Sequence, residues 1–109
     1  MRTTLNSKWG GTGFNDALIL SALASGCRYG LEVIDRAGLS SGTVYPALRR
    51  LEAGGLVEAD WEAEGEAHAE GRPARRYYRL TAAGEAALSE AVSRIHARQR
   101  ALGWADRGE

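Results

Sequence analysis

The apolar residues of the chain first recur at helical spacing. Residues 16–24 are almost entirely apolar, residues 29–37 carry apolar side chains at helical intervals, and residues 41–53 repeat them at steps of four and three. Such spacing gathers apolar side chains on one face of a helix. We therefore predict three successive helices over these ranges, the first capped by Asn15 or Asp16. The residues expected to face inward in the second and third helices are Leu31, Ile34, Val44, Leu48 and Leu51, with Val33 as a further candidate in the second.

After residue 56 the period of the pattern changes to two. Apolar and acidic residues alternate over residues 57–64, which is typical of a half-buried strand with one acidic face. Trp61 falls on the apolar side of this alternation and Glu62 on the acidic side. Residues 65–73 are rich in Gly, Ala and Glu and are predicted to be a loop, and residues 74–80 form a second strand. The two strands together predict a β-hairpin with a long loop.

A long final helix is predicted to begin after Thr81, which is a good N-terminal capping residue, and Glu85 suits its first turn. Its apolar residues follow the spacing of a coiled-coil seam, with Gln99 as a polar member. The helix over residues 16–24 is apolar around nearly its whole circumference, and such a helix needs cover on several sides. We therefore predict a homodimer. The interface residues expected from these two helices are Leu18, Leu88, Val92, Ile95 and Leu102.

The order of the elements is helix, helix, helix, strand, strand, long helix. The second and third helices are joined by the short turn 38–40, as in a helix-turn-helix. A β-hairpin after a helix-turn-helix predicts a winged helix, so the fold class is mainly α with a small β-hairpin. We expect a flexible N-terminal arm over 1–13, a winged helix-turn-helix domain over 14–80, and a C-terminal dimerisation helix and tail over 81–109.

The third predicted helix has the features of a recognition helix. Small residues at its N-terminus would let it approach a DNA groove closely, and its two arginines could reach bases or phosphates. The alternative is an ordinary amphipathic helix whose arginines are only solvated. Pro46 lies inside this helix and predicts a local bend or a later helix start. The side chains on its solvent face are Gly42, Thr43, Tyr45, Pro46, Arg49 and Arg50.

Four arginines fall within eight residues of the hairpin. Arg75 and Arg79 share the outward face with the acidic residues of the first strand, so we expect them to form cross-strand ion pairs. Arg72 lies beside Gly71 at the predicted tip and is the best candidate for a DNA phosphate contact. Arg76 is an intermediate candidate. The acidic residues of the tip would repel DNA, so the tip must point away from it or move.

Composition and motifs exclude several function classes. The net charge is zero, so the position of the charges, rather than their sum, must indicate a nucleic-acid partner. The single cysteine, Cys27, permits no disulfide within one chain. No phosphate-binding glycine loop, metal-ligand spacing or nucleophile with a base is present, so we predict neither an enzyme nor a cofactor. No apolar stretch is long enough to cross a bilayer, and we expect a cytoplasmic protein.

Three segments resemble the PadR-like family of transcriptional regulators. Residues 39–57 are similar to the family's helix signature, residues 71–84 to its wing signature, and 29–32 to the start of its second helix. The resemblance covers about residues 16–95. It implies a winged-helix homodimer of the short subfamily that represses genes by binding a palindromic operator in double-stranded DNA. The residues it assigns to DNA contact are Ser41, Thr43, Tyr45 and Arg49 in the recognition helix and Arg72 at the wing.

Many members of this family bind a small lipophilic or aromatic effector at the dimer interface. Trp9 and Trp104 could line such a pocket, although a tryptophan at an interface or a frayed end is the favoured interpretation. The acidic wing loop and the Gly-rich arm depart from the family pattern. Two alternatives to a DNA-binding regulator follow, namely a winged helix that binds another protein, and a dimer whose main property is its ligand pocket.

Overall fold

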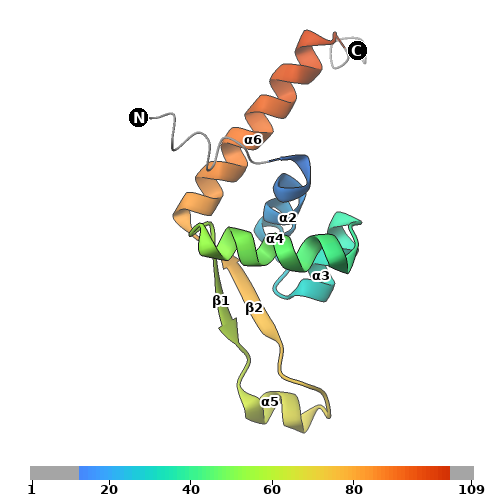
Figure 1. Cartoon of the computed structure of the whole chain (residues 1–109), viewed down its shortest axis with the longest axis vertical. Helices are drawn as coiled ribbons and strands as arrows, with labels where there is room; N and C mark the ends of the chain where they lie inside the picture. Colours follow the sequence, from blue (N-terminus) through green and yellow to red (C-terminus); the bar gives the residue numbers. More distant parts are fainter. Residues whose placement is uncertain (1–12, 104–109) are drawn as a thin grey trace.

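The computed structural model describes residues 13–103. The residues outside this range include almost all of the predicted arm, the predicted C-terminal tail, and both Trp9 and Trp104. The described elements, in chain order, are α2 (Phe14–Ala24), α3 (Gly30–Ala37), α4 (Ser41–Ala53), β1 (Val57–Trp61), α5 (Glu64–Ala69), β2 (Arg76–Leu80) and α6 (Ala82–Ala101). Figure 1 shows α2, α3 and α4 gathered into one body, from which the hairpin and α6 extend in opposite directions.

The core lies where the three helices meet the base of the hairpin. Ile19 and Leu20 of α2 are fully buried, as are Val33 of α3 and Val44 and Leu48 of α4. Helix α2 is packed against α3, α4, α6 and β2 of the same chain. The apolar circumference of α2 is therefore covered largely within one chain. This differs from the prediction, in which a partner subunit was needed to cover it.

The hairpin is a two-stranded antiparallel sheet. Its register runs from Val57 opposite Leu80 to Trp61 opposite Arg76. The segment before α3 joins the sheet, because Tyr29 forms an isolated bridge with Tyr77. The N–H of Tyr78 also donates to the carbonyl of Arg28 at 2.7 Å. These bonds fix the base of the hairpin against the start of α3.

The tip of the hairpin differs from its prediction. Strand β1 ends at Trp61, and the segment predicted to be a loop contains helix α5 over Glu64–Ala69. Trp61 is 65% exposed, whereas Glu62 is only 8% exposed, so the predicted alternation is reversed at these two positions. The reversal has a tertiary cause, because the chain leaves the strand after Trp61 and the Glu62 carboxylate binds Arg72.

The ends of the first two helices also differ from their predictions. Helix α2 begins at Phe14 with Gly13 at its N-cap position, so neither Asn15 nor Asp16 is the cap. In α3 Val33 is fully buried and Ile34 is partly buried against the core, as predicted, while Leu31 is 62% exposed and its inward prediction is wrong. Leu31 is in the first turn of α3, on the side that faces the hairpin rather than α2.

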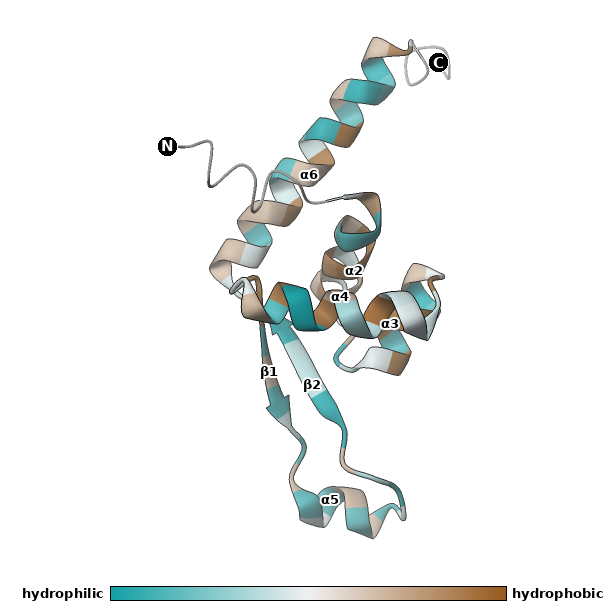
Figure 2. Cartoon of the chain, viewed as in Figure 1, coloured by the Kyte–Doolittle hydropathy of each residue, from teal (hydrophilic) through white to brown (hydrophobic). Residues whose placement is uncertain are grey.

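Helix α6 begins as predicted. The Thr81 side chain accepts a hydrogen bond from the Gly84 N–H at 3.0 Å, which confirms Thr81 as the cap. The first half of α6 packs on α2 through small residues, and Ala87 and Ala91 are buried there. The rest of α6 extends beyond the body, and Figure 2 shows apolar residues recurring along it between polar ones. Leu102, in the predicted seam, is 76% exposed.

Candidate nucleic-acid interface

Helix α4 presents one buried and one exposed face. Val44, Ala47, Leu48 and Leu51 are buried against the body. The residues exposed on its other side are Ser41, Gly42, Pro46, Arg49 and Arg50, and Thr43 is half-buried. The helix starts at Ser41 with Ser40 as its N-cap residue, and the Ser40 hydroxyl donates to the Thr43 hydroxyl at 3.2 Å. The sequence prediction for this element is therefore confirmed in its bounds and in its buried face.

Pro46 does not delay the start of the helix. It lies in the second turn of α4, so the alternative of a later helix start is wrong. Proline has no N–H, so it removes the bond that would otherwise reach the Gly42 carbonyl. Because Gly42 and Pro46 are both exposed, this stretch of α4 presents a carbonyl and an apolar ring with little side-chain bulk.

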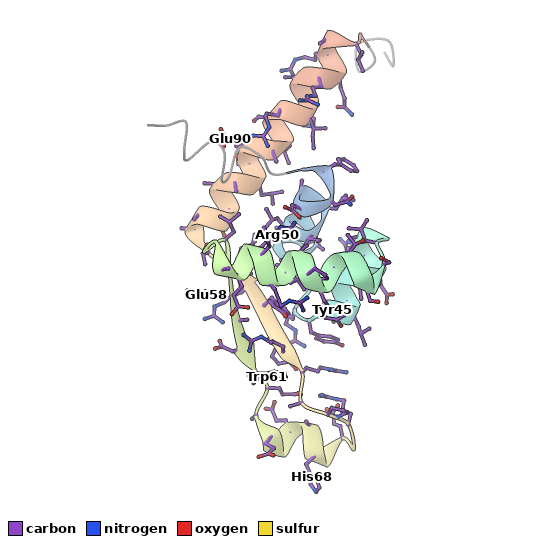
Figure 3. All side chains as sticks on the ribbon, in the orientation of Figure 1. Tyr45, Arg50, Glu58, Trp61, His68 and Glu90 are labelled. Carbon is purple, nitrogen blue, oxygen red and sulfur yellow. The ribbon has the colours of Figure 1, made fainter. Side chains whose placement is uncertain are left out.

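Tyr45 is held against α3 and is not free on the solvent face. It is half-buried and packs against the core. Gly30, at the start of α3, makes room for it, because a Cβ atom there would come to 2.6 Å from the Tyr45 Cζ and hydroxyl. Figure 3 shows Tyr45 on the side of α4 that faces the hairpin and Arg50 on the opposite side.

The two arginines of α4 differ in whether a carboxylate pairs with them. Arg50 forms an ion pair with Asp16 of α2, at 2.7 Å between Nη2 and Oδ1. Arg49 is exposed, and no carboxylate in the described range 13–103 pairs with it. Arg49 is therefore the arginine of α4 that could bind a phosphate or a base without first giving up a partner.

Arg72 closes the tip of the hairpin. Its guanidinium binds the Glu62 carboxylate through two hydrogen bonds of 2.6 and 2.8 Å, and also binds Glu70 at 2.8 Å. Glu62 further accepts hydrogen bonds from the Arg75 backbone N–H at 3.2 Å and the Tyr77 hydroxyl at 3.1 Å. Arg72 is thus held by two carboxylates with 19% of its side chain exposed, rather than projecting freely from a loop.

These bonds set the ionisation of the pair. The hydrogen bonds from Arg72, with those from Arg75 and Tyr77, lower the pKa of Glu62 to about 2. The same carboxylate, with Glu70, raises the pKa of Arg72. Both groups are therefore charged at neutral pH, and a phosphate would have to compete with Glu62 for Arg72.

The remaining arginines of β2 also have partners. Arg79 pairs with Glu58 and Asp60 at 2.8 Å each, as the cross-strand prediction required. Arg76 pairs with Glu52 of α4 at 3.0 Å, which ties the hairpin to the C-terminal half of that helix. All three ion pairs are partly exposed, so each contributes little to stability, but together they neutralise both arginines.

Arg75 is the exception in the hairpin. Its predicted ion pair with the acidic residues of β1 is wrong, since its guanidinium carbon lies 4.1 Å from the centre of the Tyr29 ring. Within residues 13–103 no carboxylate pairs with this guanidinium, although its backbone N–H binds Glu62. Sequence reasoning missed this residue because strand alternation placed it opposite acidic side chains, while its actual neighbour comes from the segment before α3.

Residues 13–103 contain neither a metal-binding cluster nor a membrane-spanning helix. Within the described part of the chain, no group of three or more His, Cys, Asp or Glu side chains is arranged to hold a metal ion. The helices in residues 13–103 include none with the length and apolar character needed to cross a bilayer.

Comparisons with known proteins agree on the family and the fold. Residues 19–90 match the sequence profile of the transcriptional regulator PadR-like family. The transcriptional regulator Rv3488 of Mycobacterium tuberculosis is 50% identical over 52 residues, which are 48% of this chain. These residues make up only 43% of that relative's length.

Solved structures share the architecture over most of the chain. A PadR family transcription regulator from Clostridium difficile superposes with a TM-score of 0.73 at 27% identity, covering 84% of this chain and 96% of the other. A homodimeric winged helix-turn-helix DNA-binding domain from Mycobacterium bovis, a possible ArsR-family regulator, gives a TM-score of 0.58 at 27% identity. That match covers 91% of this chain and 87% of the other.

Proposed function

The chain belongs to the PadR-like family of transcriptional regulators, and we propose that it represses genes by binding an inverted-repeat operator in double-stranded DNA as a homodimer. Its fold is a winged helix-turn-helix, the architecture of DNA-binding regulators. The observation that carries the proposal is the exposed face of α4, which combines small residues with an arginine that has no carboxylate partner within residues 13–103.

We assign base recognition to the N-terminal part of α4. Ser41 and Gly42 have small side chains, so the helix could enter a major groove closely, and Arg49 follows two turns later on the same side. The helix N-terminus favours nearby phosphate groups. Arg50 and Arg76 were also predicted to contact DNA, but each holds a carboxylate, so their contribution requires a change of partner on binding.

Features of α6 support the dimer. Val92 on α6 and Leu102 at its C-cap are exposed, and Ile95 between them is half-buried. Leu18 of α2 is also only partly buried. Apolar residues at this spacing are typical of paired helices. In such a dimer the two recognition helices would enter successive major grooves about 34–36 Å apart.

To test this proposal, the purified full chain selects DNA from a random pool of duplexes at moderate salt. The mass of the protein in solution is measured in parallel. A dimer that enriches one inverted repeat is the expected result. Arg49→Ala should weaken binding to that repeat by about 1–3 kcal/mol. Arg79→Ala is the matched control, because Arg79 is engaged by two carboxylates of β1. Equal losses from the two substitutions would contradict the assignment of α4.

A second candidate function is binding of another protein. The exposed side of α5 carries Glu64, Glu66 and Glu70, so the wing tip is acidic where DNA-binding wings are usually basic. A dimer that enriches no DNA sequence and binds random duplex no better at low salt would favour this function.

On the ground of the family resemblance, we also propose that a small lipophilic or aromatic effector binds at the dimer interface. Stoichiometric binding of an apolar dye that weakens DNA binding would support such a site. A dye that does not bind the dimer would count against it.

A further inference from the structure

A cleft of about 400 Å³ is lined by residues from the start of α3, from α4 and from the hairpin. Leu31 of α3 and Trp61 of β1 lie at this cleft and are 62% and 65% exposed. Tyr45 of α4 lines it between them. Figure 3 shows Tyr45 and Trp61 on α4 and the hairpin, on the two sides of this region. Two large apolar side chains thus remain exposed beside an element that we propose enters DNA.

The cleft is cationic as well as apolar. Among the described residues that line it, three are arginines and none is acidic. Arg72 and Arg76 hold carboxylates that lie outside the cleft lining, whereas Arg75 has no such partner within residues 13–103. The guanidinium of Arg76 lies 5.2 Å from the Trp61 ring centre, and this cation–π contact helps to hold the indole in place.

We propose that this cleft binds one sugar-phosphate strand of the DNA, with Trp61 and Leu31 covering deoxyribose and Arg75 binding a phosphate. The proposal rests on the proposed function, and it adds a contact surface outside α4. A DNA strand alternates apolar sugar edges with anionic phosphates, and the cleft offers matching apolar side chains and a guanidinium that has no carboxylate partner within residues 13–103.

The position of the cleft supports a DNA strand as its occupant. Tyr45 lines the cleft and is followed in α4 by Pro46, which is exposed with Arg49 on the face proposed to enter the groove. A strand that borders this groove would therefore pass between α4 and the hairpin. The cation–π contacts of Arg75 and Arg76 order both side chains before binding, which reduces the entropy lost on association.

The direct test uses the fluorescence of Trp61. The chain has three tryptophans, so the double variant Trp9→Phe, Trp104→Phe leaves Trp61 as the sole reporter. Its emission is expected to shift to the blue and to change in intensity when the duplex enriched by the selection is added. In parallel, Trp61→Ala should bind that duplex about tenfold more weakly, which corresponds to covering roughly 60 Å² of ring. Trp61→Phe should restore most of the affinity.

A second readout concerns Arg75. In a dimer, Arg75→Ala removes two phosphate contacts, so the plot of log affinity against log salt should become shallower by about 1.8. Arg79→Ala, on the same strand but with two carboxylate partners, should leave the slope unchanged. This difference in slope separates a phosphate contact from a purely structural role.

The outcomes distinguish this proposal from the proposed function. A labelled duplex that fails to bind the unsubstituted chain overturns both. A duplex that binds with full affinity to Trp61→Ala and leaves Trp61 emission unchanged overturns the cleft alone. A Trp61 response to benzoate, with none to DNA, would assign the cleft to a small aromatic anion and would equally overturn the proposal.

Discussion

Gly84 lies where α6 crosses the start of the hairpin, and its replacement by alanine tests how this helix docks. A Cβ atom at Gly84 would overlap the carbonyl oxygen of Leu56 and lie 3.2 Å from Leu80 Cδ2. The Leu56 carbonyl is fixed, because it accepts the Thr81 N–H at 3.1 Å. The methyl group therefore meets backbone that cannot turn aside, and either α6 moves or this hydrogen bond breaks.

The size of the effect follows from the kind of neighbour. Overpacking usually destabilises a fold by about 1–3 kcal/mol. Because the new methyl group meets backbone rather than a flexible side chain, we expect a cost near the upper value, about 3 kcal/mol. Domains of this size are stable by about 5–15 kcal/mol, and each kcal/mol changes the melting temperature of a domain of up to about 100 residues by roughly 4–8 °C. We therefore expect Gly84→Ala to lower the melting temperature by about 12–24 °C.

Circular dichroism at equal protein concentration measures this shift, because melting of the proposed dimer would depend on concentration. Gly65→Ala is the matched control, since a Cβ atom at Gly65 in α5 would meet nothing within 4 Å. Alanine is the better helix former, so this control should melt at or above the temperature of the unsubstituted chain. A Gly84→Ala chain that melts with the control would refute the docking of α6 described above.

Two further predictions concern the hairpin and the recognition helix. Because the pKa of Glu62 in the folded chain is about 2, below its ordinary 4.5, its carboxylate stabilises the fold above about pH 4.5, and this contribution is lost as the pH falls towards 2. The melting temperature should therefore fall more steeply over that range for the unsubstituted chain than for Glu62→Gln, and parallel curves would show that the ion pair with Arg72 does not form. Gly30→Ala should displace the ring end of Tyr45, which can move, so a urea titration should show a loss of only about 1 kcal/mol. If Tyr45 shapes the DNA-binding face, that variant should also bind operator DNA more weakly, and unchanged affinity would remove Tyr45 from the interface.

Helix α4 could be predicted closely from the sequence because its signals are local. Val44, Leu48 and Leu51 follow one helical stripe, and Gly54 comes immediately after the helix. Helix periodicity and an end signal need no information from distant residues. The structure accordingly begins and ends α4 at Ser41 and Ala53, as predicted.

The wing tip could not be predicted in this way because it depends on contacts across the loop. Local alternation placed Glu62 outward and Arg72 at an exposed tip, yet the two residues, ten positions apart, bind each other. The pairing buries Glu62 and turns Trp61 to the surface. The sequence did place an arginine and a glutamate at the two ends of the loop, which could have indicated this ion pair. The alternation of apolar and acidic residues in β1, however, made a solvent-exposed Glu62 an equally reasonable prediction.

The arginine count is a poor guide to DNA contact in this chain because most of the relevant arginines are already paired. Thirteen of the fourteen basic residues are arginine, and the net charge is zero. Ion pairs neutralise Arg50 beside α4 and Arg72 in the hairpin, while Arg49 and Arg75 have no carboxylate partner within residues 13–103. Non-specific DNA binding comes almost entirely from phosphate neutralisation, so paired arginines weaken it. With only Arg49 and Arg75 lacking a carboxylate partner among the arginines of α4 and the hairpin, these elements must derive more of their affinity from fit within the groove and from apolar contact with the strand. This is the physical reason why exposed Trp61 beside α4 belongs to the proposed interface.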